Sequence, residues 1–237
     1  MVAASPHIVV LSGAGLSVAS GIPTFRGPGG LWEGRTLSEI ATPEAWRADP
    51  VAVQRFYDAR RRHVESARPN AAHQALAQLQ RALGVPRVTL ITQNVDGLLQ
   101  QAGASRVIEM HGSLRRLRCE DDPKHPRVSV AGEQPPEGMC PVCFAALRPD
   151  VVWFGEVPHG LPEIERAVHG ATLFVSVGTS GQVYPAAGLG AVAAAGGAHT
   201  VEVNPAPSEA HWIAERIAEP AEVAMPRLVS EWTARFA

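Results

Sequence analysis

The chain has 237 residues, which is enough for one large domain or for one domain that carries a smaller insert. Its formal net charge of −2 provides no basic field for nucleic acid or an anionic membrane, and its apolar runs are too short to span a bilayer. The first residues show no charged region with a cleavage site, so we expect a cytoplasmic protein. Three cysteines cannot complete a set of disulfides.

Five short apolar runs predict the strands of a sheet, and each is followed by a turn rich in Gly, Ser, Thr, Asn, Asp or His. The runs cover residues 7–11, 87–92, 106–110, 171–177 and 199–203. Runs this apolar suit strands covered on both faces, which indicates a parallel sheet. Ligands of such sheets bind beyond the carboxyl ends of the strands, where all five turns would lie.

Helical patterns alternate with these strands. The segment 70–84 carries apolar residues on one stripe, with Asn70 as a cap at its start and Gly84 at its end. Segments 161–170 and 226–236 also predict helices. Strands that alternate with helices predict a doubly wound, Rossmann-like α/β fold.

Two stretches depart from this alternation and predict a small second lobe. Residues 27–69 begin with a glycine-rich loop and continue into helices, one of which would have Asp49 as its cap and Pro50 in its first turn. Residues 113–149 are irregular, rich in proline and charge, and contain all three cysteines. The larger domain would then comprise residues 1–26, 70–112 and 150–237.

A glycine-rich motif, GAGLSVASGIPTFRG, follows the first predicted strand. Gly13 and Gly15 would let the backbone approach a pyrophosphate at the N-terminus of a helix. Val18 stands where a full dinucleotide fingerprint has its third glycine. The motif alone is compatible with nucleotide binding or with a turn that only connects the strand to the next segment.

Polar residues follow two further strands. Asn94 and Asp96, in TQNVDGLL, could recognise a carboxamide, because Asn offers a donor and an acceptor and Asp offers an acceptor. The alternative is an Asx turn that caps a helix. His111 stands at the end of the next strand beside Gly112, where it is either structural or a candidate general base.

The stretch RFYDARRRH carries Tyr57 and Arg60 three residues apart in a helical pattern. This spacing puts a phenol and a guanidinium side by side on one helix face. Together they could hold a carboxylate or a phosphate. The alternative is an ordinary solvated helix face.

Eight short motifs occur along the chain in the order GAGLS, GIPTFRG, TQNVDGLL, HG, C-x2-C, RPDVVWFGE, GTS and VEVN. In type and order they resemble the sirtuin family of NAD-dependent protein-lysine deacylases, over about residues 7–225. The resemblance implies that NAD is consumed. The acyl-lysine carbonyl oxygen attacks the ribose carbon that bears nicotinamide, nicotinamide leaves and an alkylamidate forms. His111 would act as general base for the ribose hydroxyls, and water would then release lysine and O-acyl-ADP-ribose.

The resemblance also implies roles along the NAD molecule. Asn94 and Asp96 would contact the nicotinamide amide and Gln93 its ribose, while a mobile loop with Phe25 and Arg26 would close over the cofactor. The implied NAD-binding residues are Gly13, Ala14, Gly15, Ser17, Pro23, Thr24, Phe25, Arg26, Trp32, Gln93, Asn94, Val95, Asp96, Gly178, Thr179, Ser180, Asn204 and Ala221.

The substrate side follows from the same resemblance. Tyr57 and Arg60 match the Y-x-x-R pair with which one sirtuin class reads the carboxylate of succinyl- or malonyl-lysine, and Ala41 matches the small residue that widens that pocket. Val152 and Phe154 would line the lysine tunnel, and the peptide would pair as an added strand against VVWFGE (residues 151–156) and the GQVYP loop (residues 181–185). We therefore expect removal of succinyl, malonyl and acetyl groups from lysine.

Two other activities remain open, a plain lysine deacetylase and an NAD-dependent protein ADP-ribosyltransferase. The presence of His111 together with an intact Y-x-x-R pair, which serves acyl-lysine, disfavours the ADP-ribosyltransferase. An NAD oxidoreductase is disfavoured because the third fingerprint glycine is missing. The expected partners are acyl-lysine proteins or peptides, without nucleic acid or membrane, and a monomer is the default expectation.

A structural zinc ion is the second cofactor that the resemblance implies. Sirtuins hold it on two C-x2-C pairs, whereas this chain has Cys140 and Cys143 as one pair and Cys119 alone. Asp122 stands where the fourth cysteine would be, and carboxylate oxygen is a permitted zinc ligand. We expect Asp122 to complete the site; the alternatives are ligation by His125 and a lobe that holds no metal.

Overall fold

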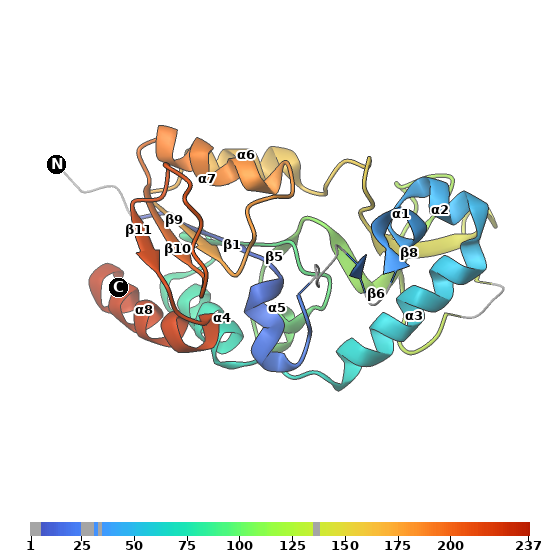
Figure 1. The fold of residues 1–237 in the computed structure, drawn as a ribbon, viewed down its shortest axis with the longest axis horizontal. Helices are drawn as coiled ribbons and strands as arrows, with labels where there is room; N and C mark the ends of the chain where they lie inside the picture. Colours follow the sequence, from blue (N-terminus) through green and yellow to red (C-terminus); the bar gives the residue numbers. More distant parts are fainter. Residues whose placement is uncertain (1–5, 25–30, 33–34, 135–137) are drawn as a thin grey trace.

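The computed structural model describes residues 6–24, 31–32, 35–134 and 138–237. Its centre is a parallel sheet of six strands in the order β11-β10-β9-β1-β4-β5 (Figure 1). The strands are β1 (Ile8–Ser12), β4 (Val88–Thr92), β5 (Val107–Glu109), β9 (Leu173–Val177), β10 (His199–Val203) and β11 (Glu215–Ile217). The five strands expected from the sequence are present and parallel, and the short edge strand β11 joins them.

Helices cover both faces of this sheet, which confirms the doubly wound α/β prediction (Figure 1). Ile8 and Val10 of β1 enter the core on one face, and Val9 and Leu11 enter the core on the other. This two-sided burial explains why the strand reads as an uninterrupted apolar run. The covering helices are α4 (Ala71–Leu83) and α8 (Ala221–Phe236) on the first face, and α6 (Leu161–His169) and α7 (Ala186–Ala195) on the second.

Local signals set the ends of two helices where the sequence predicts them. Asn70 caps α4 with its side chain, the ring of His73 accepts a hydrogen bond from the Asn70 backbone, and Gly84 follows the last turn. Asp49 caps α3 (Pro50–Ser66) in the same manner. These caps satisfy amide groups that the helices themselves leave unpaired.

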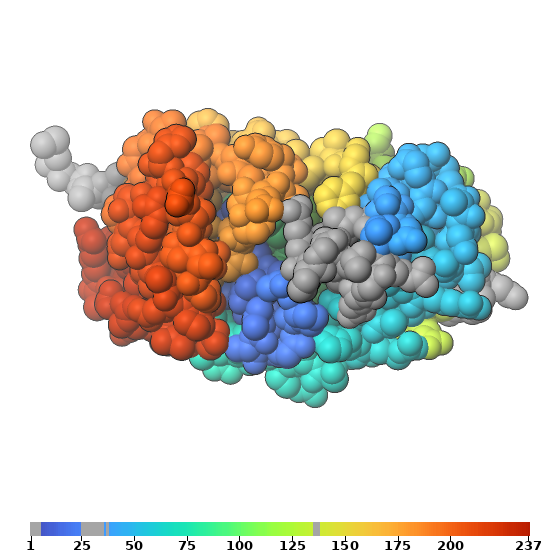
Figure 2. All heavy atoms as spheres, in the orientation of Figure 1, coloured from blue at the N-terminus to red at the C-terminus, as the bar shows by residue number. Residues whose placement is uncertain are grey.

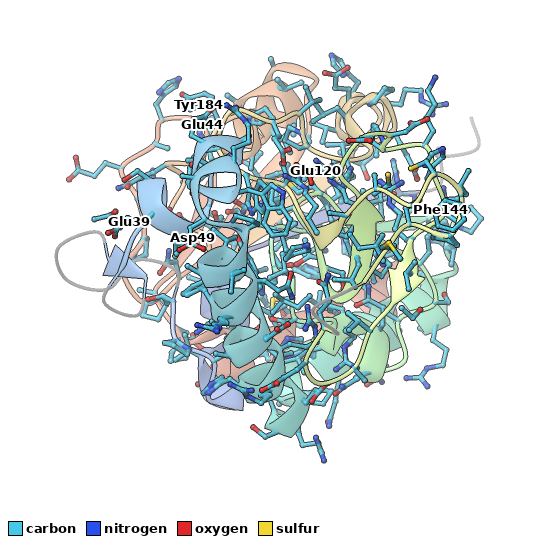
Figure 3. All side chains as sticks on the ribbon, turned by 90° about the vertical axis from the view of Figure 1, so that its right-hand side faces the viewer. Glu39, Glu44, Asp49, Glu120, Phe144 and Tyr184 are labelled. Atoms are coloured by element: carbon cyan, nitrogen blue, oxygen red, sulfur yellow. The ribbon has the colours of Figure 1, made fainter. Side chains whose placement is uncertain are left out.

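The second lobe lies beside the sheet, at the right of Figure 1, and the space-filling view shows its helices in light blue and cyan at the right, with the red part of the chain at the far left (Figure 2). Figure 3 views this lobe from its own side, with Glu44 and Asp49 on its helices and Phe144 at the opposite edge. Its residue boundaries stay a prediction. Besides α3, its elements are β2 (Leu31–Trp32), β3 (Arg35–Thr36), α1 (Leu37–Ile40), α2 (Pro43–Ala48), β6 (Gly112–Cys119), β7 (Val128–Ser129) and β8 (Leu147–Val151).

Two helices differ from the sequence expectation. α7 is not among the expected helices because glycines interrupt its alanine-rich run. Gly190 is required there by packing, since a Cβ atom at this position would lie 2.4 Å from the ring of Trp212. α8 begins at Ala221 rather than at Pro226, because the fully buried Met225 anchors its first turns in the core. Within the described ranges, no helix is long and apolar enough to cross a membrane.

Candidate active site

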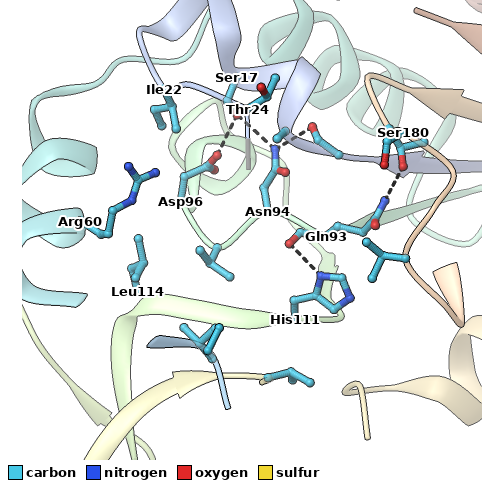
Figure 4. A pocket seen from close by; sticks show the side chains of 18 of the residues that line it. Ser17, Ile22, Thr24, Arg60, Gln93, Asn94, Asp96, His111, Leu114 and Ser180 are labelled. Carbon is cyan, nitrogen blue, oxygen red and sulfur yellow. Dashed lines mark hydrogen bonds between the residues drawn. The ribbon is translucent and has the colours of Figure 1, made fainter. Parts of the chain in front are cut away.

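A cavity of about 460 Å³ lies between the sheet and the second lobe, where β1, β4 and β9 end (Figure 4). This is the edge at which parallel sheets bind ligands, and the volume suits a small-molecule site. The structure brings most of the expected site residues to it. Those that line the cavity are Gly13, Ala14, Gly15, Ser17, Pro23, Thr24, Ala41, Tyr57, Arg60, Gln93, Asn94, Val95, Asp96, His111, Val152, Phe154, Gly178, Thr179, Ser180 and Asn204.

Four expected NAD-binding residues are not placed at the cavity. Ala221 is buried in the hydrophobic core at the start of α8 and does not line the cavity. Phe25 and Arg26 lie outside the described residues. The backbone of Trp32 belongs to β2, but its side chain also lies outside what the structure describes.

The glycine loop after β1 packs against the loop after β9. The Gly15 amide donates to the Gly178 carbonyl at 2.8 Å, and a Cβ atom on Gly15 would lie 2.6 Å from the Gly178 Cα. A Cβ atom on Gly13 would likewise meet Gly178 and Thr179 at 2.9 Å. These glycines are therefore needed for the contact between two loops of the cavity wall. The segment after them is a short 3-10 helix, η1 (Ala14–Ser20).

Two buried side chains, Ser17 and Asp96, and the half-buried Asn94 join in a network at the centre of the cavity. Ser17 donates its hydroxyl to the Asp96 carboxylate at 2.7 Å, and the Asn94 amide donates to Ser17 at 3.2 Å and to the Gly13 carbonyl at 3.0 Å. The other carboxylate oxygen of Asp96 accepts from the Leu98 backbone at 2.9 Å. Asp96 therefore makes the Asx turn of the alternative reading and also lines the cavity, and its contact with a carboxamide stays a prediction.

His111 lies at the junction of β5 and β6. Its Nδ1 is 3.2 Å from the backbone carbonyl oxygen of Gln93. A carbonyl can only accept, so Nδ1 carries the proton and Nε2 is the basic nitrogen. Burial lowers the pKa of His111, and this effect outweighs the hydrogen bond to Gln93, which raises the pKa. The ring is therefore neutral at pH 7 and can take up a proton.

The far wall of the cavity is held by hydrogen bonds between its own residues. The Gln93 amide donates to the Thr179 hydroxyl at 3.0 Å, and the Asn204 amide donates to the Thr179 carbonyl at 3.1 Å. Figure 4 places Ser180 at this end and Arg60 at the opposite end, with Asn94 and His111 between them. The cavity is thus an elongated site with a cation at one end.

Tyr57 and Arg60 do not lie on a solvated helix face. Tyr57 is 0% and Arg60 is 4% exposed, although both come from the polar-looking helix α3. Burial raises the pKa of Tyr57 well above its ordinary value, so the phenol is protonated throughout the physiological range. A protonated phenol and a guanidinium at one end of a cavity are hydrogen-bond donors suited to an anion.

Sequence reasoning did not name about a third of the cavity wall as individual site residues. Several of these residues adjoin motifs that the sequence singles out, and Trp153 lies within RPDVVWFGE itself, so adjacency was the available signal. Most of the apolar ones come from loops and short strands, where no sequence period shows which side chains face the cavity, and Val64 comes from α3. Of these lining residues, Val151, Trp153, Gly155, Glu156, Val183 and Tyr184 lie in the two segments that the sequence assigns to peptide pairing, whereas Ile22, Val64, Leu114 and Pro158 carried no such assignment.

A second cluster lies in the small lobe, away from the cavity residues. Among the described residues, the ligand atoms of Cys119, His125, Cys140 and Cys143 lie within 4.8 Å of one another. The Nδ1 of His125 is 3.4 Å from the Cys140 sulfur and 3.5 Å from the Cys143 sulfur, and the sulfurs of Cys119 and Cys143 are 3.5 Å apart. These separations match the edges of a tetrahedron with zinc–ligand bonds of about 2.0–2.3 Å.

Asp122 is not part of this cluster, contrary to the sequence expectation. Its backbone amide points at the Cys119 sulfur at 3.5 Å, while its carboxylate accepts from the Lys124 backbone at 2.8 Å. The turn therefore directs the carboxylate away from the sulfurs. Its second oxygen lies 3.6 Å from Nε2 of His125, on the side of the ring opposite the cluster. His125 takes the position that the sequence assigned to Asp122.

Comparisons with known proteins agree with this geometry. A sequence model of the Sir2 family matches residues 13–185. The chain is 47% identical to an NAD-dependent protein deacylase of Escherichia coli strain K12, over 95% of this chain and 82% of the relative. It is 48% identical to a protein of the same name from Yersinia pseudotuberculosis, over 86% of this chain and 74% of the relative.

Solved structures give the same result. A Sir2 homologue in complex with NAD has a TM-score of 0.88 at 39% identity, covering 99% of this chain and 92% of that one. A Sir2 protein with a p53 peptide and NAD+ has a TM-score of 0.77 at 28% identity, covering 96% and 94%. On the family-model match, the sequence identity and the shared fold, the chain belongs to the Sir2 family.

Proposed function

We propose that this chain is an NAD-dependent protein-lysine deacylase that prefers acidic acyl groups, such as succinyl and malonyl, over acetyl. The observation that carries the proposal is the burial of Tyr57 and Arg60 in the same cavity as His111. The relatives from Escherichia coli and Yersinia that are named NAD-dependent protein deacylase support the general activity.

NAD fits the end of the cavity that the loops after β1, β4 and β9 form. Both Nδ2 hydrogens of Asn94 have partners in Ser17 and Gly13, which leaves its carbonyl oxygen to accept from the nicotinamide amide. Asp96, fixed by Ser17 and its own turn, would accept from the same amide. Gln93 would contact the adjoining ribose. Gly178, Thr179, Ser180 and Asn204 would hold the adenosine half.

NAD supplies an activated ribose carbon with nicotinamide as its leaving group. This chain contributes a base, His111, whose Nε2 would accept a proton from a ribose hydroxyl. The buried, preorganised hydrogen bonds of the cavity would orient the acyl-lysine and exclude bulk water.

At the acyl end, Arg60 would bind the distal carboxylate through its planar fork of donors, and Tyr57 would donate its hydroxyl. Ala41 leaves room for the longer acyl chain, because its side chain ends at Cβ. Val152 and Phe154 would flank the lysine stem between this pocket and His111. An acetyl group fits the same tunnel but offers nothing for the guanidinium to bind.

The protein substrate would pair as an extended strand against residues 151–156 and the loop of residues 181–185. This mode uses backbone hydrogen bonds, so it tolerates many sequences around the lysine. Exposed apolar side chains border this part of the cavity: Phe154 is 40% and Tyr184 is 80% exposed.

We also propose that the cluster of Cys119, His125, Cys140 and Cys143 binds a structural zinc ion. Three thiolates and an imidazole are a standard zinc ligand set. The Asp122 carboxylate beside the outer ring nitrogen of His125 would orient the ring, as carboxylates beside zinc-bound histidines commonly do.

Mass spectrometry of one reaction tests the proposed activity. A succinyl-lysine peptide incubated with the protein and NAD should lose its succinyl group, with nicotinamide and O-succinyl-ADP-ribose appearing in equal amounts. His111→Ala should strongly slow both loss of the succinyl group and formation of O-succinyl-ADP-ribose, because both follow the step that needs the base. Transfer of ADP-ribose to protein with the acyl group left in place would instead support a transferase and would defeat the proposal.

A further inference from the structure

Trp153 donates a hydrogen bond to the hydroxyl oxygen of Tyr57 inside the wall of the cavity. The Nε1 to Oη distance is 2.9 Å, and the two residues are 2% and 0% exposed. An indole N–H can only donate, so the phenol oxygen must accept in this bond. The phenol proton is then directed away from the indole. Nothing in the Y-x-x-R motif itself fixes this orientation.

The indole of Trp153 is itself held from several sides. The guanidinium carbon of Arg148 lies 3.6 Å from the centre of its ring, a cation–π stack. Arg148 also contacts both carboxylate oxygens of Glu156 at 2.8 Å, and one of these oxygens accepts from the Trp153 backbone amide at 2.8 Å. The ring of Trp46 also packs against the ring of Trp153, with 5.8 Å between the ring centroids. The position of the Nε1 hydrogen is therefore fixed by the surrounding structure.

We propose that Trp153 is a positioning residue for acyl-group selection, acting through Tyr57. A phenol O–H has two preferred in-plane orientations, and the Trp153 N–H excludes the one that points at the indole. The orientation that remains directs the proton into the cavity that Tyr57 shares with Arg60, toward the acyl carboxylate. This inference rests on the proposed preference for acidic acyl groups. It adds a residue that lines the cavity and would act on the acyl carboxylate through the Tyr57 hydroxyl.

The test compares Trp153→Phe with the wild type on one peptide that carries either succinyl or acetyl lysine. Phenylalanine keeps an aromatic ring under Arg148 but lacks the N–H. We expect KM for the succinyl peptide to rise about three- to tenfold, the effect of one net hydrogen bond, with a smaller change in kcat. The ratio of kcat/KM for succinyl over acetyl should fall by the same factor.

Two comparisons separate this role from general packing. Trp46→Phe is the matched control, because it removes an indole N–H from the same aromatic cluster without touching the Tyr57 hydroxyl, and it should keep the ratio. In a Tyr57→Phe background, Trp153→Phe should lower the ratio no further. An unchanged ratio in Trp153→Phe, or fully additive effects with Tyr57→Phe, would overturn the inference.

A misfolded Trp153→Phe protein would be replaced by a variant with 3-benzothienylalanine at this position, which keeps the bicyclic shape and exchanges N–H for sulfur. The same fall in the ratio is expected. The succinyl preference of Arg60→Met, compared with that of the Trp153 variants, shows whether the inference or the proposed function has failed. If that variant loses the succinyl preference while the Trp153 variants retain it, the inference alone is wrong. If the wild type has no succinyl preference, the proposed function is wrong with it.

Discussion

His111 and Gln93 are joined by a hydrogen bond of 3.2 Å from the imidazole Nδ1 to the backbone carbonyl, which leaves Nε2 as the basic nitrogen in the cavity. Burial lowers the pKa of His111 below its ordinary value of about 6.5. The working base is the neutral ring, so activity rises as pH rises through this pKa. We expect the acidic limb of kcat/KM to have its midpoint below pH ~6.5.

Initial rates with a fixed peptide and NAD, measured between pH 5 and 8 in buffers of constant ionic strength, would locate that midpoint. His111→Ala should lose the limb together with about 10²- to 10⁴-fold of the rate. An acidic midpoint at or above the ordinary histidine value would contradict a neutral, buried base.

Arg61 and Arg62 should affect stability very differently, although they are neighbours. Arg61 is fully buried and donates to the Asp58 carboxylate at 2.5 Å and to the backbone carbonyls of Leu114 and Gly132 at 2.6 and 2.8 Å. Arg61→Met would strand a buried carboxylate, so we expect a loss of about 3–5 kcal/mol in the free energy of unfolding. Urea denaturation measures this loss.

Arg62→Met provides the matched comparison on the same helix. Arg62 pairs with Glu133 at the surface, where both side chains are more than half exposed. Such pairs contribute about 0–1 kcal/mol. If both variants lost the same free energy of unfolding, the burial of Arg61 would not be the cause of its larger expected effect, and the prediction would be wrong.

The two glycines inside α7 should respond to alanine with opposite signs. A Cβ atom on Gly188 would make an ordinary contact of 3.8 Å with Tyr184, so Gly188→Ala should stabilise the protein by about 0.5–1 kcal/mol through helix propensity. A Cβ atom on Gly190 would lie 2.4 Å from Trp212, so Gly190→Ala should destabilise by about 1–3 kcal/mol. Thermal unfolding of both variants checks the contrast.

Zinc binding distinguishes His125 from Asp122. We expect His125→Ala to lose most of its bound zinc and to unfold at a lower temperature, because a ligand has been removed. Asp122→Asn should retain zinc with an affinity weakened by about 10- to 100-fold, as for other residues that orient a ligand. Metal content by mass spectrometry and competition with a chelator give the values. If Asp122→Asn lost its zinc and His125→Ala kept it, the fourth ligand would be Asp122, as expected from the sequence, and not His125.

The sequence predicted the sheet and the cavity well because both rest on local patterns. Strands buried on both faces give continuous apolar runs, and α4 carries its own cap at Asn70. The turns that end these strands supply Asn94, Asp96 and His111, and parallel strands bring such turns to one edge. Chain order alone therefore placed these residues together.

What the sequence could not give depends on contacts between distant segments. Three consecutive arginines look alike, yet Arg60 lines the cavity, Arg61 is buried against β6 and Arg62 lies at the surface. The exchange of Asp122 for His125 follows from the direction of one turn, which residue spacing does not encode. The bond between Trp153 and Tyr57 joins two segments 96 positions apart.

The most direct test of the proposed function is the ratio of kcat/KM for succinyl over acetyl on one lysine peptide, in the wild type, Arg60→Met and the surface control Arg62→Met. The account predicts a ratio well above one in the wild type and in Arg62→Met. In Arg60→Met the succinyl value should fall at least about 30-fold, because the acyl carboxylate loses its buried partner, while deacetylation persists. A wild-type preference for acetyl that Arg60→Met leaves unaltered would contradict it.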